Sequence, residues 1–146
     1  MKILAVDWGE RRLGFAVSDE TGRIAFPLSV VTCGSEKERT QAVLGKLAET
    51  GAGTLVVGLP LTMQGKEGES AAAVRAFSRG LEKAGGVPIV LWDERLTTDI
   101  AERASREKRG GRRGKRPERV DSIAACVLLQ GYLDYLGKPP DGQAGP

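Results

Sequence analysis

Apolar residues in the first part of the chain form three short runs separated by polar turn residues. The runs cover Lys2–Trp8, Leu13–Ser18 and Ile24–Thr32 and are rich in β-branched and aliphatic side chains. Runs of this length joined by short loops predict three strands of an antiparallel meander. Because proline cannot donate a ladder hydrogen bond, Pro27 predicts that the third strand lies at an edge of the sheet.

From Ser35 onward, helical spacings alternate with short, wholly apolar runs. Ser35 followed three residues later by Glu38 is a capping box, which marks the start of a helix. Continuous apolar runs bounded by Gly or Pro are typical of strands buried on both faces. The elements predicted in this way are a helix over residues 35–50, a strand Thr54–Val57, a helix near Ser70–Ala84, a strand Pro88–Trp92, a helix from Thr98 to about Arg106, a mobile loop Lys108–Arg116 and a last helix Pro117–Leu136.

This order of elements predicts an α/β fold. Bare apolar strands alternating with helices indicate parallel strands, and the meander adds antiparallel ones. We therefore expect a mixed five-stranded sheet, an antiparallel meander plus two parallel strands, flanked by helices. No internal repeat or composition boundary divides the chain, so residues 1–137 are expected to form a single domain. The Pro- and Gly-containing tail, residues 138–146, is expected to be disordered.

The composition excludes several kinds of site. The 146 residues include no histidine, so neither a Ser-His-Asp triad, nor a Cys-His pair, nor a His-ligated zinc site is possible. The only cysteines, Cys33 and Cys126, form no CxxC motif and are expected to be reduced, buried thiols. Neither a signal peptide nor a window of membrane-spanning length is found, so we expect a soluble, cytoplasmic protein.

Positive charge is concentrated in one segment. The whole chain carries a net charge of +3, but Arg103–Arg119 holds nine basic residues against two acidic ones, leaving −4 on the remainder. A charge run is often only solvated surface, yet next to an acidic body it favours contact with a polyanion such as nucleic acid. The strongest candidates for phosphate contacts are Arg109, Arg112, Arg113, Lys115 and Arg116.

Three acidic residues follow apolar stretches or lie on a packed helix face. Asp7 ends the first predicted strand, Glu94 and its neighbour Asp93 follow the last strand, and Asp121 lies in the first turns of the last helix. Each has a structural interpretation: a turn cap for Asp7, the start of a loop for Glu94, and interaction with the helix dipole for Asp121. Sites in open α/β sheets lie beyond the carboxyl ends of the parallel strands, which is where Asp93 and Glu94 fall. Taken together, the three acids favour a shared functional role over three separate structural ones.

Three carboxylates in a protein without histidine favour a site for hard cations. Carboxylate oxygens suit Mg²⁺ or Mn²⁺, which bridge protein and phosphate groups. Two such ions can activate a water molecule and stabilise the leaving oxygen of a phosphodiester. With a basic segment in the same chain, this pattern predicts metal-dependent phosphodiester hydrolysis.

Four segments extend this interpretation: Asp7–Ala16, Val57–Leu61, Asp93–Thr98 and Val120–Ala125. Together, in this order and spacing over about residues 1–136, they resemble the four signature blocks of the YqgF family of RuvX-like proteins. Members of that family are described as Holliday junction resolvases and as pre-16S rRNA nucleases. The resemblance implies an RNase H-like fold, and it implies that Asp7, Glu94 and Asp121 are the catalytic, metal-binding carboxylates.

Arginines beside the carboxylates have two possible roles. Arg12 and Arg95 either hold substrate phosphates or pair with the neighbouring acids, and Arg11 is a further candidate for nucleic-acid binding. Both roles suit a guanidinium group, which binds carboxylate and phosphate oxygens in the same bidentate geometry.

The function predicted from these features is a metal-dependent endonuclease acting on structured nucleic acid. The resemblance favours processing of the 5′ end of pre-16S rRNA in ribosome biogenesis, with resolution of four-way DNA junctions as the alternative. An ATP-handling enzyme is a remote alternative, because Asp7-x-Gly also resembles the phosphate loop of actin-like ATPases. A non-catalytic nucleic-acid-binding module is a third. Both a monomer and a homodimer are compatible with the sequence.

Overall fold

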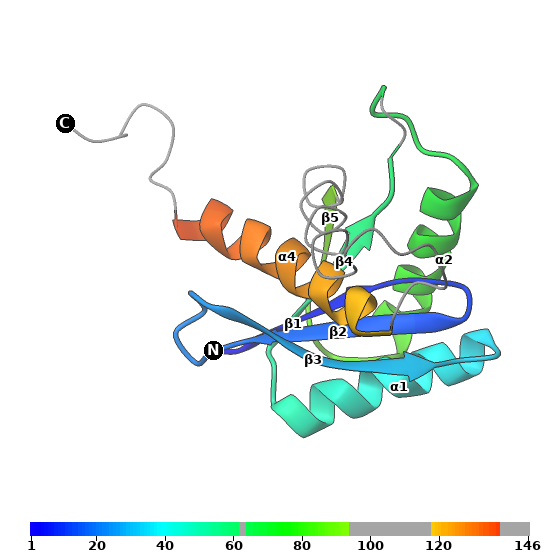
Figure 1. The fold of residues 1–146 in the computed structure, drawn as a ribbon. Coiled ribbons are helices and arrows are strands. Elements are labelled where there is room, and N and C mark those ends of the chain that lie inside the picture. Colours follow the sequence, from blue (N-terminus) through cyan, green and yellow to red (C-terminus); the bar gives the residue numbers. More distant parts are fainter. Residues whose placement is uncertain (62–63, 94–117, 138–146) are drawn as a thin grey trace.

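The computed structural model describes residues 1–61, 64–93 and 118–137 (Figure 1), with the side chains of 118–120 left out of the description. The predicted helix from Thr98, the loop Lys108–Arg116 and the tail 138–146 lie outside the described residues. The elements are β1 Ile3–Asp7, β2 Arg12–Ser18, β3 Ala25–Thr32, α1 Glu36–Thr50, β4 Thr54–Leu59, α2 Glu69–Ala84, β5 Ile89–Asp93 and α4 Glu118–Gly137.

The strands form one mixed sheet in the order β3-β2-β1-β4-β5. β1 pairs antiparallel with β2, and β2 pairs antiparallel with β3, so the predicted meander is confirmed. β4 lies parallel to β1, and β5 lies parallel to β4. β3 is an edge strand, as Pro27 predicted, and the ladder shifts register beside the Ala16–Pro27 pair.

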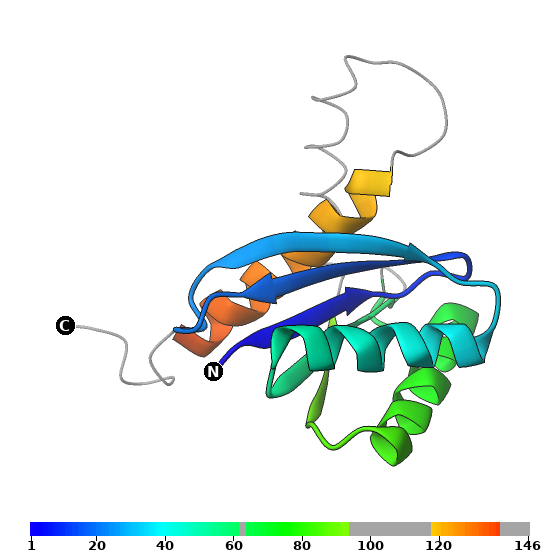
Figure 2. The same cartoon turned by 90° about the horizontal axis from the view of Figure 1, so that it is seen from below.

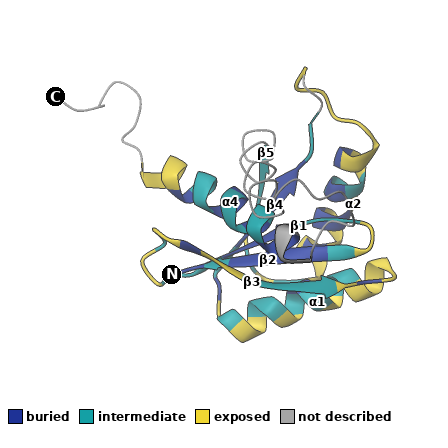
Figure 3. Cartoon of the chain, viewed as in Figure 1, coloured by how far each residue is buried: buried dark blue, intermediate teal, exposed yellow. Residues whose placement is uncertain are grey.

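Helices cover both faces of the sheet. α4 packs across β1, β2 and β3, whereas α1 and α2 cover the opposite face (Figures 1 and 2). Because successive strand residues point to opposite faces, each strand contributes to both cores. In β1, Leu4 and Val6 pack beneath α1 and α2, while Ile3 and Ala5 pack beneath α4. Figure 3 shows the central strands buried and the C-terminal end of α4 exposed.

The two cores differ in the size of their side chains. The core beneath α1 and α2 contains Phe15, Phe77 and several leucines and valines. In the core beneath α4, the buried residues of β1, β2 and β3 are Ala5, Ala16 and Ala25, while the larger Val56, Val90 and Trp92 come from β4 and β5. Small side chains allow a helix to approach a sheet closely, so α4 lies nearer to the backbone of the sheet than a helix resting on leucines would.

The predicted start of α1 at Ser35 is confirmed, although its capping pattern differs from a simple capping box. The Ser35 hydroxyl accepts a hydrogen bond from the Glu38 amide at 3.2 Å. The Glu38 carboxylate accepts from the Gly34 amide at 2.7 Å, rather than from the amide of Ser35 itself. The two caps satisfy donors on both sides of the helix start, which fixes the turn between β3 and α1.

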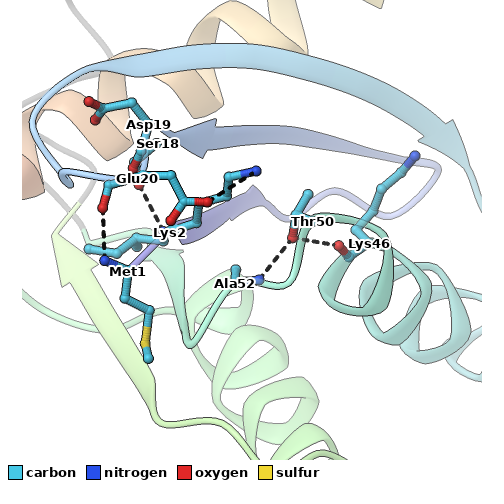
Figure 4. A network of polar contacts seen from close by, with 9 residues as sticks. Met1, Lys2, Ser18, Asp19, Glu20, Lys46, Thr50 and Ala52 are labelled. Atoms are coloured by element: carbon cyan, nitrogen blue, oxygen red, sulfur yellow. Dashed lines mark hydrogen bonds and ion pairs between the residues drawn. The ribbon is translucent and has the colours of Figure 1, made fainter.

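Polar contacts at the start of β1 fix the end of the strand remote from Asp7 (Figure 4). The N-terminal amine donates to the Glu20 carbonyl at 2.8 Å, and the Ile3 amide donates to the Ser18 hydroxyl at 2.8 Å. The Gly53 amide donates to the Lys2 carbonyl at 3.0 Å. β1 is therefore tied to β2 on one side and to the start of β4 on the other.

Within the described part of the chain, no helix combines the length and the apolar character needed to cross a membrane.

Candidate active site

Asp7 is the last residue of β1 and is half-buried. By the alternation along the strand, its side chain lies on the same face as those of Ile3 and Ala5, both of which pack beneath α4. The sequence predicted that these three residues share a face. Asp7 therefore faces α4, the element that carries Asp121.

Gly14 connects Asp7 with α4. In the antiparallel ladder of β1 and β2, Asp7 lies directly opposite Gly14, so both residues point to the α4 face. A Cβ atom on Gly14 would lie 2.2 Å from the carbonyl oxygen of Asp121 and 3.0 Å from its Cβ. Only glycine allows this approach, because any side chain would collide with the backbone of α4. Asp7 and Asp121 therefore both adjoin Gly14, although 113 positions separate them in the sequence.

Asp121 is buried in the first turn of α4, with 8% of its surface exposed. Ala125 and Leu128, one and two turns further along, are also buried, so this row faces the sheet as its spacing predicted. Ala124, named in the same row, is half-buried. A carboxylate at such a position is costly without compensating positive charge.

Arg12 supplies positive charge to Asp121. Its Nε lies 3.1 Å from Oδ2 of Asp121, and the Asp121 side chain is only 11% exposed. Arg12 begins β2 and lies on the same face as Gly14, two residues further on. Of the two roles expected for this arginine, the structure shows pairing with an acid.

A residue that the sequence did not single out, Arg39 of α1, holds the loop between β1 and β2. Its guanidinium lies over the Trp8 ring, 5.5 Å from the ring centroid, and donates to the Glu10 carbonyl at 2.8 Å. It also donates to the Glu36 carboxylate at 2.9 Å. Trp8 itself packs against the core beneath α1 and α2. The loop that joins Asp7 to Arg12 is thus fixed to the helix by a cation–π contact and a hydrogen bond.

Arg11 and Asp93 do not share the positions of Arg12 and Asp7 on the α4 face of the sheet. Arg11 is exposed in the β1–β2 loop, and its carbonyl accepts from the Cys33 amide at 2.8 Å. Asp93 ends β5 on the face shared by Ile89 and Leu91, which pack beneath α1 and α2. Asp93 therefore lies on the opposite face of the sheet from Asp7, which argues against a role as a third ligand.

The remaining predicted site residues lie outside the described part of the chain. They are Glu94, Arg95, Arg109, Arg112, Arg113, Lys115 and Arg116. Among the described residues, no three acidic or cysteine side chains form a group that could hold a metal ion. The described residues that fit Mg²⁺ or Mn²⁺ are Asp7 and Asp121, two hard oxygen donors that adjoin Gly14.

A family model and two similar sequences agree on one family. A family model described as "RuvX: Holliday junction resolvase" matches residues 1–135. A protein of Anaeromyxobacter sp. (strain Fw109-5) is 46% identical over 134 residues, which cover 92% of this chain and 97% of that protein. A protein of Chloroflexus aggregans (strain MD-66 / DSM 9485) is 40% identical over 137 residues, covering 94% and 96%. Both carry the name "Putative pre-16S rRNA nuclease".

Solved structures give the same fold. Thermus thermophilus RuvC in complex with a Holliday junction substrate superposes with a TM-score of 0.57 at 18% identity, covering 94% of this chain and 97% of that one. Fowlpox virus resolvase with Holliday junction DNA superposes with a TM-score of 0.59 at 14% identity, covering 94% and 100%. The expected RNase H-like fold is thereby confirmed. From the family match over nearly its whole length and the relatives at 40–46% identity, we conclude that the chain belongs to the RuvX family.

Proposed function

We propose that this protein is a metal-dependent endonuclease that hydrolyses phosphodiester bonds of structured nucleic acid. The observation that supports this proposal is the placement of Asp7 and Asp121 around Gly14, on one face of the sheet. Glu94 directly follows the last residue of β5 in the sequence and is the third proposed carboxylate. Nuclease activity also agrees with the names of the family and of the relatives.

In the proposed mechanism, Asp7, Glu94 and Asp121 hold Mg²⁺ or Mn²⁺. When bound, such ions activate water and neutralise charge at the scissile phosphate. The protein contributes fixed donor positions: β1 orients Asp7, and the close contact at Gly14 orients Asp121. These contacts hold the backbone of both residues in place before the cation and the substrate arrive.

The basic residues are assigned to binding of the nucleic-acid backbone. Arg11 is exposed in the loop between β1 and β2 and is proposed to contact a substrate phosphate. Arg95, which follows Glu94 in the sequence, is proposed to do so as well, together with five residues of the basic segment: Arg109, Arg112, Arg113, Lys115 and Arg116. Contacts of this kind release counterions from the nucleic acid, so the affinity should fall steeply as the salt concentration rises.

We propose precursor 16S rRNA as the substrate, with cleavage at its 5′ end and a cytoplasmic site of action. This choice follows the name shared by relatives that are 40% and 46% identical over more than nine tenths of the chain. Four-way DNA junctions are the second candidate, supported by the description of the family model and by the substrates of the two structural neighbours.

A cleavage assay with Mn²⁺ on matched pre-16S rRNA and four-way junction substrates tests the proposal. Wild-type protein should cut the RNA, and Asp7→Asn should lose at least about a thousandfold in rate while still folding and binding RNA. Asp134→Asn is the matched control, because it removes an exposed carboxylate from the other end of α4. Cleavage of the junction alone would favour the second substrate, and full activity of Asp7→Asn would overturn the mechanism.

Thermal melting in the presence of Mn²⁺ separates this proposal from a non-catalytic binding module. A protein that holds the cation in its native state gains thermal stability as the cation concentration rises. Wild-type protein should therefore melt at a higher temperature with Mn²⁺, and Asp7→Asn should gain less. Equal melting temperatures with and without Mn²⁺, together with intact RNA binding, would favour the non-catalytic module.

A further inference from the structure

We propose that Arg12 is a built-in counter-ion of Asp121 that competes with the divalent cation, and that the guanidinium turns to a substrate phosphate once the cation has taken its place. The inference rests on the proposed function, since it assumes that Asp121 is a metal ligand. The sequence left two alternative roles open for Arg12, and the inference assigns both to it in succession.

The first argument is the burial of Asp121. Its carboxylate lies against β2 and is 11% exposed, and Nε of Arg12 lies 3.1 Å from its Oδ2. A charged carboxylate with so little access to water is costly to bury unless a positive charge lies beside it. Arg12 supplies that charge. A divalent cation bound at Asp121 would supply the same compensation, so the guanidinium and the cation compete for one carboxylate.

The second argument is the position of Arg12 relative to both carboxylates. Arg12 and Gly14 are on the same face of β2, and Asp7 lies opposite Gly14 in the ladder. A cation shared by Asp7 and Asp121 would thus be bound next to the guanidinium group. Like charges at such short range repel strongly where water is partly excluded. Arg12 must either weaken cation binding or move away when the cation binds.

The third argument is that the Arg12 side chain can move while its backbone stays fixed. Its side chain is 31% exposed, so a path to solvent is open. The preceding loop is held by Arg39 at the Glu10 carbonyl and by the Cys33 amide at the Arg11 carbonyl. Motion should therefore be confined to side-chain rotation. A guanidinium released in this way can bind a phosphate through two parallel hydrogen bonds.

This arrangement couples the two ligands of the site. A cation at Asp121 frees Arg12 for a phosphate, and a phosphate that holds Arg12 away from Asp121 favours the cation. By linkage, each ligand raises the affinity of the other by the same factor. The cation should accordingly bind weakly to the free protein and more tightly when nucleic acid is present.

Calorimetric titration of the full chain with Mn²⁺, in the absence of nucleic acid, tests the inference. Arg12→Gln should bind Mn²⁺ roughly tenfold more tightly than wild type, because one positive charge beside the cation is removed. Arg12→Lys retains the charge and should bind Mn²⁺ as weakly as wild type. Arg79→Gln removes an exposed charge on α2 and is the control for net charge. It too should match wild type.

If Arg12→Gln is unstable, melting curves provide a second measurement. Mn²⁺ should then raise its melting temperature by more than that of wild type, because the cation replaces the missing charge at Asp121. Equal or weaker Mn²⁺ binding by Arg12→Gln, with no larger thermal gain, would overturn the inference while leaving the proposed function intact. Absence of Mn²⁺ binding in all four proteins would overturn the metal-dependent function itself, and the inference with it.

Discussion

A Cβ atom on Gly14 of β2 would lie 2.2 Å from the carbonyl oxygen of Asp121 on α4. The contact between strand and helix is thus made by backbone atoms, and no side chain separates them. Intervening side chains would let the helix shift on the sheet, whereas this backbone contact fixes the position of the Asp121 backbone. The proposed site therefore depends on the absence of a side chain as much as on its two acids.

Gly14→Ala should destabilise the protein by about 3 kcal/mol, because the added methyl group forces α4 away from β2. Gly45→Ala is the matched control. Gly45 is exposed in α1, where a Cβ would meet nothing within 4 Å, so this change should stabilise the protein by about 0.5–1 kcal/mol. Urea denaturation measures both values, and a Gly14→Ala protein as stable as wild type would contradict the packing described above.

Arg39→Met should cost about 1–3 kcal/mol, because it removes the cation–π contact with Trp8 and the hydrogen bond to the Glu10 carbonyl. Glu36→Gln removes only the ion pair with Arg39. The Glu36 side chain is 58% exposed, so this change should cost less than about 1 kcal/mol. Chemical denaturation of the two variants gives the comparison. Equal losses would show that the ion pair, and not the contact with the loop, is the stabilising part.

Asp19 should make stability depend on pH in the acid range. Its carboxylate accepts hydrogen bonds from the Thr21 hydroxyl and from the amides of Arg23 and Ile24, which together hold its pKa far below the usual 3.8. A carboxylate whose pKa is lower in the folded than in the unfolded state stabilises the folded state at pH values above the pKa of the unfolded state. This contribution is lost as the pH falls below about 4. Asp19→Ala should therefore be less stable than wild type at pH 7, and the difference should shrink between pH 4 and pH 2.

Urea unfolding at several pH values measures this effect. Glu82→Ala, a change at an exposed acid of α2, is the control and should differ little from wild type at any pH. A constant difference between wild type and Asp19→Ala down to pH 2 would show that the loop does not depend on the ionised carboxylate.

The two thiols should react slowly in the folded protein. Burial raises the pKa of Cys33, which is 3% exposed, and it also raises the pKa of Cys126, whose Sγ donates to the Ala25 carbonyl at 3.4 Å. Because the thiolate is the reactive form, alkylation by iodoacetamide at pH 7.5 should be slower than for a free thiol. Mass spectrometry should detect the half-buried Cys126 reacting before Cys33, and rapid modification in urea is the control.

Much of the fold followed from the spacing of apolar residues. The meander, the two parallel strands, the edge position of the strand with Pro27 and the start of α1 at Ser35 were all predicted, because each depends on local propensity and on which face of an element is buried. Strand ends moved by one or two residues, most of all in β4, which continues to Leu59. Local patterns fix the ends of elements least well, since side-chain and turn contacts decide them.

The sequence by itself determined the candidate chemistry: the absence of histidine, the acids Asp7, Glu94 and Asp121, and the separated basic segment. Only the tertiary structure decided that Gly14 adjoins both Asp7 and Asp121 and that Arg12 pairs with Asp121. It also decided that Arg39 holds the loop between β1 and β2. The physical reason is that residue types and local spacing specify elements and donor atoms. Contacts between residues more than a hundred positions apart depend on how the helix packs on the sheet, which no local pattern contains.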